Sequence, residues 1–475
     1  MKLATMTVIS DDEIRRIHEA TLEILETSGV KIGSAAMLRF LKDKGLPVDG
    51  DTPVVRFPRA CIEDALTHIP PRFEVFDREG APAFVLGDGV TKVAAGHNAV
   101  FWVDTDTGET RPSTVGDVAL CARICEALPA IDMIGVPVMP QDVPHPEATL
   151  LYGLRACVAN SRKPIFFSTD RADVNRACIE MLRAAFAGDL ATQVYGISQL
   201  SPTSPLFWEA GVLDAIADTV ETGVPLAILP EPNAGVSCPY TLAGLLTMNN
   251  AECLSGLAMI QLLRPGAKVM YANSWTATDM RKGYALVGST ETTICCVAGA
   301  QLARFYKVPS HTTAPNSDNH AHDEQNAWEK ALSQFCSIAS GNDLVVNCGM
   351  FATGMTYSNE QLLMDEEMTA ISNRLRDGIR VDHATIAKDT IIEIGPQGES
   401  YLTAPHTLEW LHSDEYIEPR LTVRGPRAVW EAAGAKDTYQ LARDKVREYA
   451  QQPAKAPLDA KRLARVDEVL QDFTG

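Results

Sequence analysis

The chain has 475 residues, of which 46% are hydrophobic and 22% are charged, a balance typical of a globular protein with a substantial core. Its 61 acidic and 42 basic residues give a formal net charge of -19, which repels nucleic acids and anionic lipid surfaces. Eleven cysteines, an odd number without a C-x-x-C pair, indicate reduced thiols rather than a disulfide framework. These numbers disfavour nucleic-acid binding, membrane association and secretion.

Residues 1–111 are expected to form an N-terminal extension. Their first twenty residues lack the apolar core and cleavage site of a secretory signal, so we expect a cytoplasmic protein. Ser10 and Glu13 form a capping-box pattern, and apolar residues then recur at helical spacing until Gly29. Short β-like runs separated by Gly, Pro and Asp continue as far as residue 111. The pattern predicts one helix and a β-containing extension packed on the remainder of the chain.

Residues 112–380 show a different rhythm, in which short apolar runs alternate with longer helical stretches. This alternation predicts an α/β fold, and its constancy favours a (β/α)8 TIM-like barrel over an open sheet. The most apolar stretch, 242–263, contains Asn249, Asn250 and Glu252, which indicates a buried helix rather than a membrane span. An eighth strand is not placed; the seven predicted strands are 131–138, 164–168, 194–200, 225–231, 268–274, 308–312 and 344–349.

Residues 381–475 form the third predicted part. Residues 391–421 are rich in Pro, Gly and aromatic residues, and we expect them to run as an ordered strap across the domain. Residues 428–451 and the last fifteen residues show helical patterns, joined by a Pro-containing linker. The predicted fold is therefore a barrel with an N-terminal extension and a C-terminal strap plus helices.

Candidate functional residues lie just after the predicted strands, because the loops after the strands crowd one mouth of such a barrel. They include no acid/base pair or nucleophile triad at a recognisable spacing. Neutral polar groups, aromatic rings and one carboxylate instead suit a bound cation. We predict an aromatic cage with Glu231 as its anion, although such rings also commonly serve as packing. The predicted substrate-binding residues are Gln199, Trp208, Glu231, Asn273, Trp275, His311, Phe351 and Tyr357.

Two further groups of residues have competing interpretations. The sequence from His320 to Glu324 contains an H-x-H pair that could hold zinc, but it opens a predicted helix, where acidic residues complement the helix dipole. We therefore expect no metal. Arg281 and Lys282 could bind a substrate carboxylate, or they could belong to a solvated loop. No glycine-rich phosphate loop joins a strand to a helix, which disfavours nucleotide cofactors.

Several long segments together resemble the trimethylamine-methyltransferase superfamily. AGHNAVFWVDTDTGETRPSTVGDVALCARICEALPAIDMIGVPVMPQDVP (95–144) is similar to the stretch that leads into the first barrel strand of that family. The segments 317–368 and 394–411 are similar to its late barrel region and its tail. Archaeal trimethylamine enzymes of the family carry pyrrolysine, whereas this sequence contains only standard residues. This departure points to the branch that handles quaternary amines.

The resemblance implies a methyl transfer from a small quaternary amine, such as glycine betaine, carnitine or proline betaine, to Co(I) of a corrinoid on a partner protein. The corrinoid would belong to that partner, so this chain itself would hold no tightly bound cofactor. A homo-oligomer is also compatible with the family. No catalytic residue is carried over, because the pyrrolysine position has no matched residue here. Two alternatives remain, a zinc-dependent barrel hydrolase or deaminase using His320 and His322, and a non-catalytic betaine-binding protein.

Overall fold

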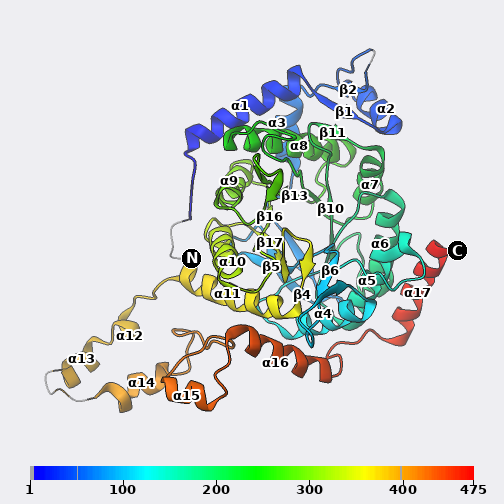
Figure 1. Cartoon of the computed structure of the whole chain (residues 1–475). Helices are drawn as coiled ribbons and strands as arrows, with labels where there is room; N and C mark the ends of the chain where they lie inside the picture. The colour runs from blue at the N-terminus through cyan, green and yellow to red at the C-terminus, as the bar shows by residue number, and fades with distance from the viewer. Residues whose placement is uncertain (1–4, 51, 396–397, 399) are drawn as a thin grey trace.

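Eight parallel strands form the centre of the computed structural model, which describes residues 5–50, 52–395, 398 and 400–475 (Figure 1). Ala94 and Met133 form a parallel bridge between the two ends of the sheet, and the Ala95 amide donates to the Met133 carbonyl at 3.1 Å. The sheet therefore closes into a TIM-like barrel, as predicted. In spatial order its strands are β5 (Lys92–Ala95), β17 (Leu344–Cys348), β16 (Ser310–Thr313), β13 (Val269–Asn273), β12 (Leu226–Ile228), β10 (Gly196–Leu200), β9 (Ile165–Ser168) and β8 (Ile134–Gly135).

The eighth strand, which the sequence left unplaced, is β5. Its four residues include two alanines, which have little β-propensity, so the segment carries a weak strand signal. The barrel consequently begins before residue 112, the boundary predicted from the sequence. This strand carries His97 and Asn98 just beyond its end.

A helix comes after each strand and packs outside the barrel (Figure 1). The α8 helix is buried on most of its surface, including Asn249, Asn250 and Glu252, because α1 and α3 cover it. Among the residues that the structure describes, no helix is both long and apolar enough to span a membrane. The surrounding helices are α4 (Val115–Ala127), α5 (Thr149–Asn160, after η1 at Pro146–Ala148), α6 (Ala172–Ala185), α7 (Ala210–Val220), α8 (Leu242–Leu263), α9 (Thr290–Tyr306), α10 (Glu324–Ala339) and α11 (Asn359–Asp377).

The N-terminal extension covers one flank and one end of the barrel. The predicted capping box is present, with the Ser10 amide donating to Glu13 Oε2 at 2.8 Å. The β3–β4 hairpin closes the amino-terminal end, where Phe73 and Val75 pack against interior residues such as Met270. The extension comprises α1 (Asp11–Thr27), β1 (Val30–Ile32), α2 (Ala35–Asp43), β2 (Val54–Val55), α3 (Arg59–His68), β3 (Phe73–Phe76) and β4 (Pro82–Leu86), and β1 pairs with β11 (Phe207–Trp208).

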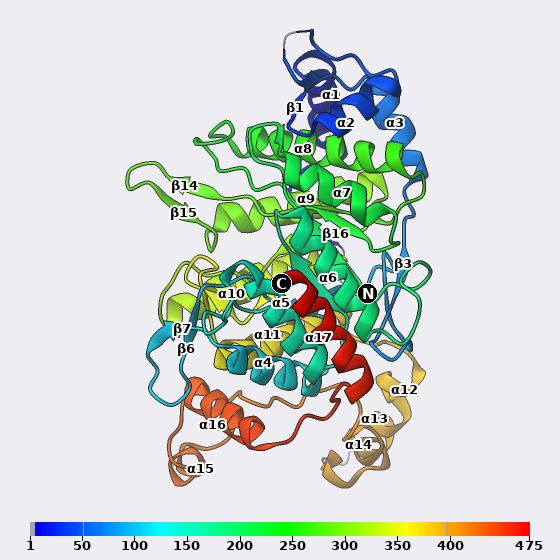
Figure 2. The same ribbon diagram turned by 90° about the vertical axis from the view of Figure 1, so that its right-hand side faces the viewer.

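Short strands elaborate the opposite, carboxyl-terminal mouth. A four-stranded sheet joins β6 (Phe101–Val103) and β7 (Thr110–Pro112) to β18 (Met350–Phe351) and β19 (Thr356–Tyr357). The hairpin of β14 (Ala277–Asp279) and β15 (Tyr284–Leu286) projects beside this mouth (Figure 2). One end of the barrel is thus plugged, and the other is surrounded by loops.

The C-terminal part divides into a strap, a projecting arm and two packed helices. Residues 418–424 form the strap between α11 and α16, and its Arg420 and Thr422 amides donate to the Glu367 carboxylate. The described residues of the segment 383–416 (383–395, 398 and 400–416), called the arm here, extend away from the barrel beside α11 instead of crossing the barrel (Figures 1 and 2). The elements are α12 (His383–Ile386), α13 (Lys388–Ile394), η3 (Tyr401–Thr403), α14 (Pro405–Trp410), α15 (Arg427–Ala432), α16 (Thr438–Gln451) and α17 (Ala460–Thr474).

Candidate functional site at the barrel mouth

A polar layer lies inside the barrel above its apolar plug. The His311 ring, from β16, stacks on Phe166 of β9 with centroids 5.1 Å apart, and His97 meets the same phenyl ring edge-on at 5.1 Å. Gln199 of β10 lies between these groups, with its Nε2 3.3 Å from His97 Nε2 and 3.2 Å from Ser168 Oγ. Three strands and the end of β5 therefore bring two imidazoles, an amide and a hydroxyl together.

The alternation of strand residues explains why these side chains face inward. On β10, Ser198 points outward and donates to Asn175 of α6 at 2.8 Å, so Gln199 points into the barrel. Ile197 of the same strand joins the interior cluster together with Phe166. The inward-facing residues of each strand are therefore apolar in the middle of the barrel and become polar toward the mouth, where they form the polar layer.

Both histidines of this layer are neutral at physiological pH. Burial lowers the pKa of His97 to about 4, and burial together with the nearby His97 lowers the pKa of His311 to about 3. Among the described residues, neither ring nitrogen of His311 has a hydrogen-bond partner, and the same holds for His97 Nδ1 and Gln199 Oε1. Buried polar groups without partners are costly, at about 1–3 kcal/mol each, so these atoms are placed to contact a ligand or water.

Glu231 supplies a carboxylate at the mouth. It comes two residues after Leu229, which belongs to the interior cluster, at the end of β12. Its side chain is accessible to solvent, yet the surrounding protein atoms raise its pKa through desolvation. No hydrogen bond or ion pair to its side chain occurs within the described part of the chain. This combination describes a carboxyl group without a counter-ion among the described residues, recessed among protein atoms and open to a cation.

A hollow of about 420 Å³ opens beside the polar layer. Ser168 belongs to its wall and accepts a hydrogen bond from Gln199, which connects the hollow to the interior groups. Asn98, in a left-handed conformation with φ of 60°, donates to the Ser168 carbonyl at 3.1 Å. The walls come from the ends of four strands and include Asn98, Met139, Ser168, Thr169, Asp170, Arg171 and Ser201.

The four aromatic residues predicted as a cage are not brought together. Trp208 is fully buried and donates to Ser255 of α8 at 3.0 Å, and Trp275 packs against Gly299 of α9. These two belong to the core between the barrel and its helices. The structure therefore does not contain the predicted aromatic cage. Each of these two rings, just after its strand, fills the space between the barrel and a surrounding helix instead of facing the mouth. Phe166 belongs to the interior cluster and contacts both His97 and His311.

The other two predicted rings lie in separate clusters on the β18–β19 hairpin. Tyr357 stacks on Trp102 with centroids 5.6 Å apart, and its hydroxyl lies 3.2 Å from Cys121 Sγ. Phe351 is buried and contacts His322, with ring centroids 4.6 Å apart. Both rings therefore support the loops of the mouth.

Asn273 also differs from its predicted role. Its side chain donates to the His311 carbonyl at 3.1 Å and accepts from Thr312 Oγ1 at 2.6 Å. It lies against Gly299 of α9, outside the barrel. Asn273 thus holds β13 and β16 together and contributes to the site only by positioning His311.

The H-x-H pair does not converge on a common point. His320 is exposed, whereas His322 lies 3.0 Å from Ser358 Oγ and stacks on Tyr439. Asp323 caps α10 by accepting from the amides of Gln325 and Asn326, as expected for a helix start. In the described ranges, no group of three or more His, Cys, Asp or Glu side chains is arranged to hold a metal ion.

Arg281 and Lys282 lie on the turn of the β14–β15 hairpin. Both residues are exposed there, and the Asp279 carboxylate accepts from their backbone amides at 2.9 and 3.3 Å. Of the two interpretations from the sequence, the structure agrees with the solvated loop. Among the described residues, the polar layer is thus formed by the neutral side chains of His97, Gln199 and His311, whereas the neighbouring hollow also carries Asp170 and Arg171.

A buried ion pair fixes the loop after β17. Lys330 Nζ lies 2.9 Å from Asp365 Oδ2, and both side chains are fully buried. The same carboxylate accepts from the Gly349 amide at 2.7 Å and from Gln361 Nε2 at 2.8 Å. This pair anchors the start of the β18–β19 hairpin against α10 and α11.

Comparison with known proteins identifies the relatives of this chain. A family profile described as "Trimethylamine methyltransferase (MTTB)" matches residues 1–475. A trimethylamine methyltransferase MttB of Desulfitobacterium hafniense is 30% identical over 98% of this chain and 93% of its own length. A glycine betaine methyltransferase of the same species is 28% identical, covering 90% of this chain and 89% of its own. Among solved structures, the Methanosarcina barkeri monomethylamine methyltransferase matches in fold, with 12% identity, a TM-score of 0.52, and coverage of 99% and 88% of the two chains.

Proposed function

The chain belongs to the trimethylamine methyltransferase (MTTB) family of amine methyltransferases, and we propose that its methyl donor is a small quaternary amine and its acceptor is a corrinoid protein. The observation that carries the proposal is the carboxyl group of Glu231, which has no counter-ion among the described residues, at a mouth above a polar layer that contains the neutral His97 and His311. A quaternary ammonium offers no proton to donate. It is held by a carboxylate, by aromatic faces and by polar neutral groups.

The neutral state of the two histidines favours this substrate. A histidinium beside the ligand would repel a cation, but burial keeps His97 and His311 uncharged at neutral pH. Phe166, between the two imidazoles, presents the aromatic surface of the interior. The polar layer can thus surround an N-methyl group without opposing its charge.

The chemistry requires no general acid or base from the protein. A corrinoid on the acceptor protein would supply a Co(I) nucleophile for the methyl carbon, and the electron pair of the broken C–N bond would stay on nitrogen. The leaving group is then a neutral tertiary amine, which needs no protonation to depart. The residues of this chain bind the cation, orient one methyl group toward the mouth and exclude water, and such positioning can contribute about 7–11 kcal/mol.

The strength of the ion pair to Glu231 also matters. The substrate loses its positive charge in the transition state, so a tight ion pair would stabilise the ground state more than the transition state. The Glu231 side chain remains accessible to water, which weakens its Coulomb attraction. We infer that Glu231 attracts and orients the amine, and that the neutral layer holds the reacting end.

Thermal unfolding in the presence of quaternary amines and their tertiary counterparts tests the proposal. A ligand that binds only the folded chain raises the melting temperature, and we expect this rise for at least one quaternary amine but not for its tertiary counterpart. The stabilising amine is then incubated with the chain and cob(I)alamin, and methylcobalamin is monitored by its absorbance. Stabilisation without methyl transfer would favour a betaine-binding protein, and no stabilisation across the panel would reject the proposed substrate class.

A further inference from the structure

Large apolar side chains are exposed at one side of the barrel mouth. A methyl group added to Gly235 would lie 2.9 Å from Met280 Sδ and 3.0 Å from a ring carbon of Tyr240, so the loop after β12 and the β14–β15 hairpin meet over this glycine. A contiguous apolar surface bordered by polar residues often marks an interaction site. The exposed side chains, called the apolar rim here, are Val236 (70%), Tyr240 (63%), Met280 (54%) and Tyr284 (65%).

The apolar rim is joined to the loop that carries Glu231. The Ala234 amide donates to the Thr276 carbonyl at 3.0 Å, and the Thr276 amide donates to the Pro232 carbonyl at 3.2 Å. Glu231 directly precedes Pro232 in the chain. The carboxyl group of the candidate site and the apolar rim therefore belong to one hydrogen-bonded unit, and a partner that contacts the rim lies next to the mouth.

The far end of the hairpin is also fixed to the body of the barrel. The Asp318 carboxylate, from the loop after β16, accepts from the amides of Val287 and Gly288, both at 3.0 Å. It also accepts from Thr353 Oγ1 at 3.2 Å, which adds the loop after β18. The hairpin thus projects beside the mouth from a base that is held at both ends (Figure 2). Little backbone ordering is needed when a partner binds it, which lowers the cost of binding.

The turn of the hairpin carries positive charge in an acidic chain. Arg281 and Lys282 are exposed there, and Asp279 accepts from their backbone amides. These three side chains carry two positive charges and one negative charge, whereas the whole chain has a formal net charge of -19. A partner with an acidic patch at this point would be attracted locally, and the patch would fix its orientation.

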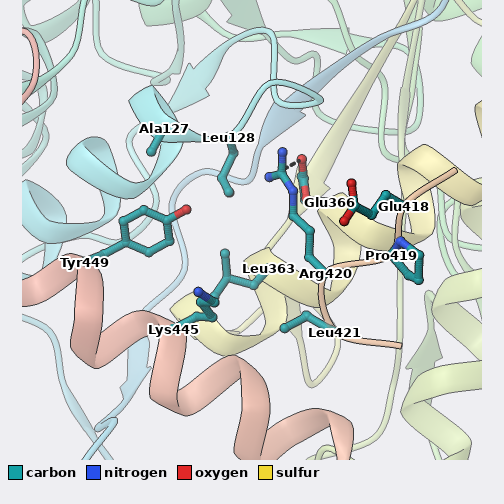
Figure 3. A pocket seen from close by; sticks show the side chains of 10 residues that line it. All are labelled: Ala127, Leu128, Leu363, Glu366, Glu418, Pro419, Arg420, Leu421, Lys445 and Tyr449. Carbon is teal, nitrogen blue, oxygen red and sulfur yellow. Dashed lines mark hydrogen bonds and ion pairs between the residues drawn. The ribbon is translucent and has the colours of Figure 1, made fainter. Parts of the chain in front are cut away.

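A second recess lies outside the mouth, between α4, α11, α16 and the strap. This hollow of about 620 Å³ is crossed by an ion pair between Arg420 Nη1 and Glu366 Oε1, 3.3 Å apart (Figure 3). Its wall includes Ala127, where α4 ends and the chain turns toward the start of β8. The hollow therefore lies toward the amino-terminal end of the barrel, and a protein bound there would not reach the mouth.

We propose that the apolar rim, together with Arg281 and Lys282, is the docking surface for the methyl-acceptor protein. The rim packs on apolar side chains that surround the accepting group, and the two basic side chains pair with an acidic patch. This inference rests on the proposed function, because the methyl acceptor has to reach this mouth. Tyrosine, methionine and arginine are enriched in protein interfaces, which agrees with the composition of the surface. The contact should be small and short-lived, since the acceptor has to leave after each transfer.

Methyl transfer to a corrinoid protein, compared with transfer to free cob(I)alamin, tests the proposal. The probe is a purified corrinoid protein in its Co(I) state that accepts methyl groups from the wild-type chain. The double variant Met280→Ser, Tyr284→Ser should lower kcat/KM for this protein by at least about 10-fold, mainly through KM, because two side chains lose their burial at the interface. Transfer to free cob(I)alamin and the rise in melting temperature with amine need no docking and should be unchanged.

Charge reversal at the turn tests the second part of the surface. The variant Arg281→Glu, Lys282→Glu should slow transfer to the corrinoid protein by about 10-fold at low ionic strength and by less at high salt, because salt screens exposed charges. The matched control is Arg39→Glu, Lys42→Glu, which changes the net charge equally at exposed positions of α2, on the flank of the barrel. The control should transfer at the wild-type rate at every salt concentration.

The outcomes separate the docking surface from the proposed function. Wild-type kinetics with the corrinoid protein in both hairpin variants would overturn the docking surface and leave the methyl donor unaffected. An equal loss with free cob(I)alamin would overturn it as well and would assign the hairpin to the amine site. A hairpin variant that changed the oligomeric mass would assign the surface to a second copy of the chain. If the wild-type chain transferred no methyl group from any quaternary amine to free cob(I)alamin, the proposed function itself would be rejected.

Discussion

The imidazole of His311 stacks on the phenyl ring of Phe166 inside the barrel, with centroids 5.1 Å apart and planes inclined by 21°, while both of its nitrogens lack a hydrogen-bond partner among the described residues. The stack fixes the ring and leaves its polar atoms unused. A side chain that is held by its apolar face and keeps its polar edge free is suited to binding a ligand. The face of the His311 ring thus contributes to stability through its stack on Phe166, whereas its two nitrogens are free to contribute to binding.

The variant His311→Phe should therefore keep its stability and lose its ligand. A phenyl ring preserves the stack and removes two unsatisfied polar atoms, so the free energy of unfolding at neutral pH should change by less than about 1 kcal/mol. Affinity for the amine, measured by titration calorimetry, should fall by about 10-fold or more because a polar contact is lost. His322→Phe provides the contrast, since His322 already contacts Ser358 at 3.0 Å and should lose stability without losing affinity. The reverse pattern would place the ligand near His322.

Acid should destabilise the fold partly through His311. Burial lowers the pKa of His311 to about 3, below the ordinary value of 6.5, so the unfolded chain takes up a proton that the folded chain refuses. The resulting stability is fully present above the unfolded pKa and is lost as the pH falls toward the folded pKa, by about 1.4 kcal/mol per pH unit. Urea denaturation between about pH 6 and about pH 4 should thus show a shallower loss for His311→Phe than for the wild type. If the free energy of unfolding fell equally with pH in the two proteins, His311 would not be protected from protonation in the folded chain.

The sequence predicted the barrel because its βα rhythm survives along most of the chain, and Gln199, Glu231 and His311 were found as residues at strand ends. His97 was missed because its strand, KVAA, is too short and too rich in alanine to stand out. The aromatic cage was misjudged for a different reason. Residues one position apart after a strand face opposite sides, and sequence alone did not show that Trp275 turns toward α9. The strap predicted for residues 391–421 was expected to cross the domain, whereas α13 and α14 project away from the barrel in a direction that depends on packing and that no local pattern encodes.

The buried pair of Lys330 and Asp365 should be essential for stability. Lys330→Met leaves the Asp365 carboxylate without its counter-ion in a fully buried position, where such losses cost about 3–5 kcal/mol. Adding Asp365→Asn removes the stranded charge and should restore part of the loss, while the Gly349 amide keeps an acceptor. Chemical denaturation of the two single variants and the double variant gives the coupling between the residues. Additive effects would show that the two charges do not interact.

Glu231→Gln tests the electrostatic basis of the proposed site. The amide keeps the size of the side chain but removes the charge, so the dissociation constant for a quaternary amine should rise by about 10-fold, as expected for one partly solvated ionic contact. Glu221→Gln is the matched control, because Glu221 is an exposed carboxylate at the end of α7, away from the mouth, and its loss changes the net charge equally. The affinity of the Glu221→Gln variant for the amine should equal that of the wild type.

The pH dependence of amine binding gives the same test without relying on one variant. Desolvation raises the pKa of Glu231, so protonation removes its charge at a higher pH than for an ordinary glutamate. Affinity should therefore be full above this raised pKa and decline as the pH falls through it, whereas Glu231→Gln should show little decline over that range. Titration calorimetry across the acidic range, restricted to conditions in which both proteins remain folded, measures the difference. Equal declines in the two proteins would assign the titrating group elsewhere and would remove Glu231 from the binding site.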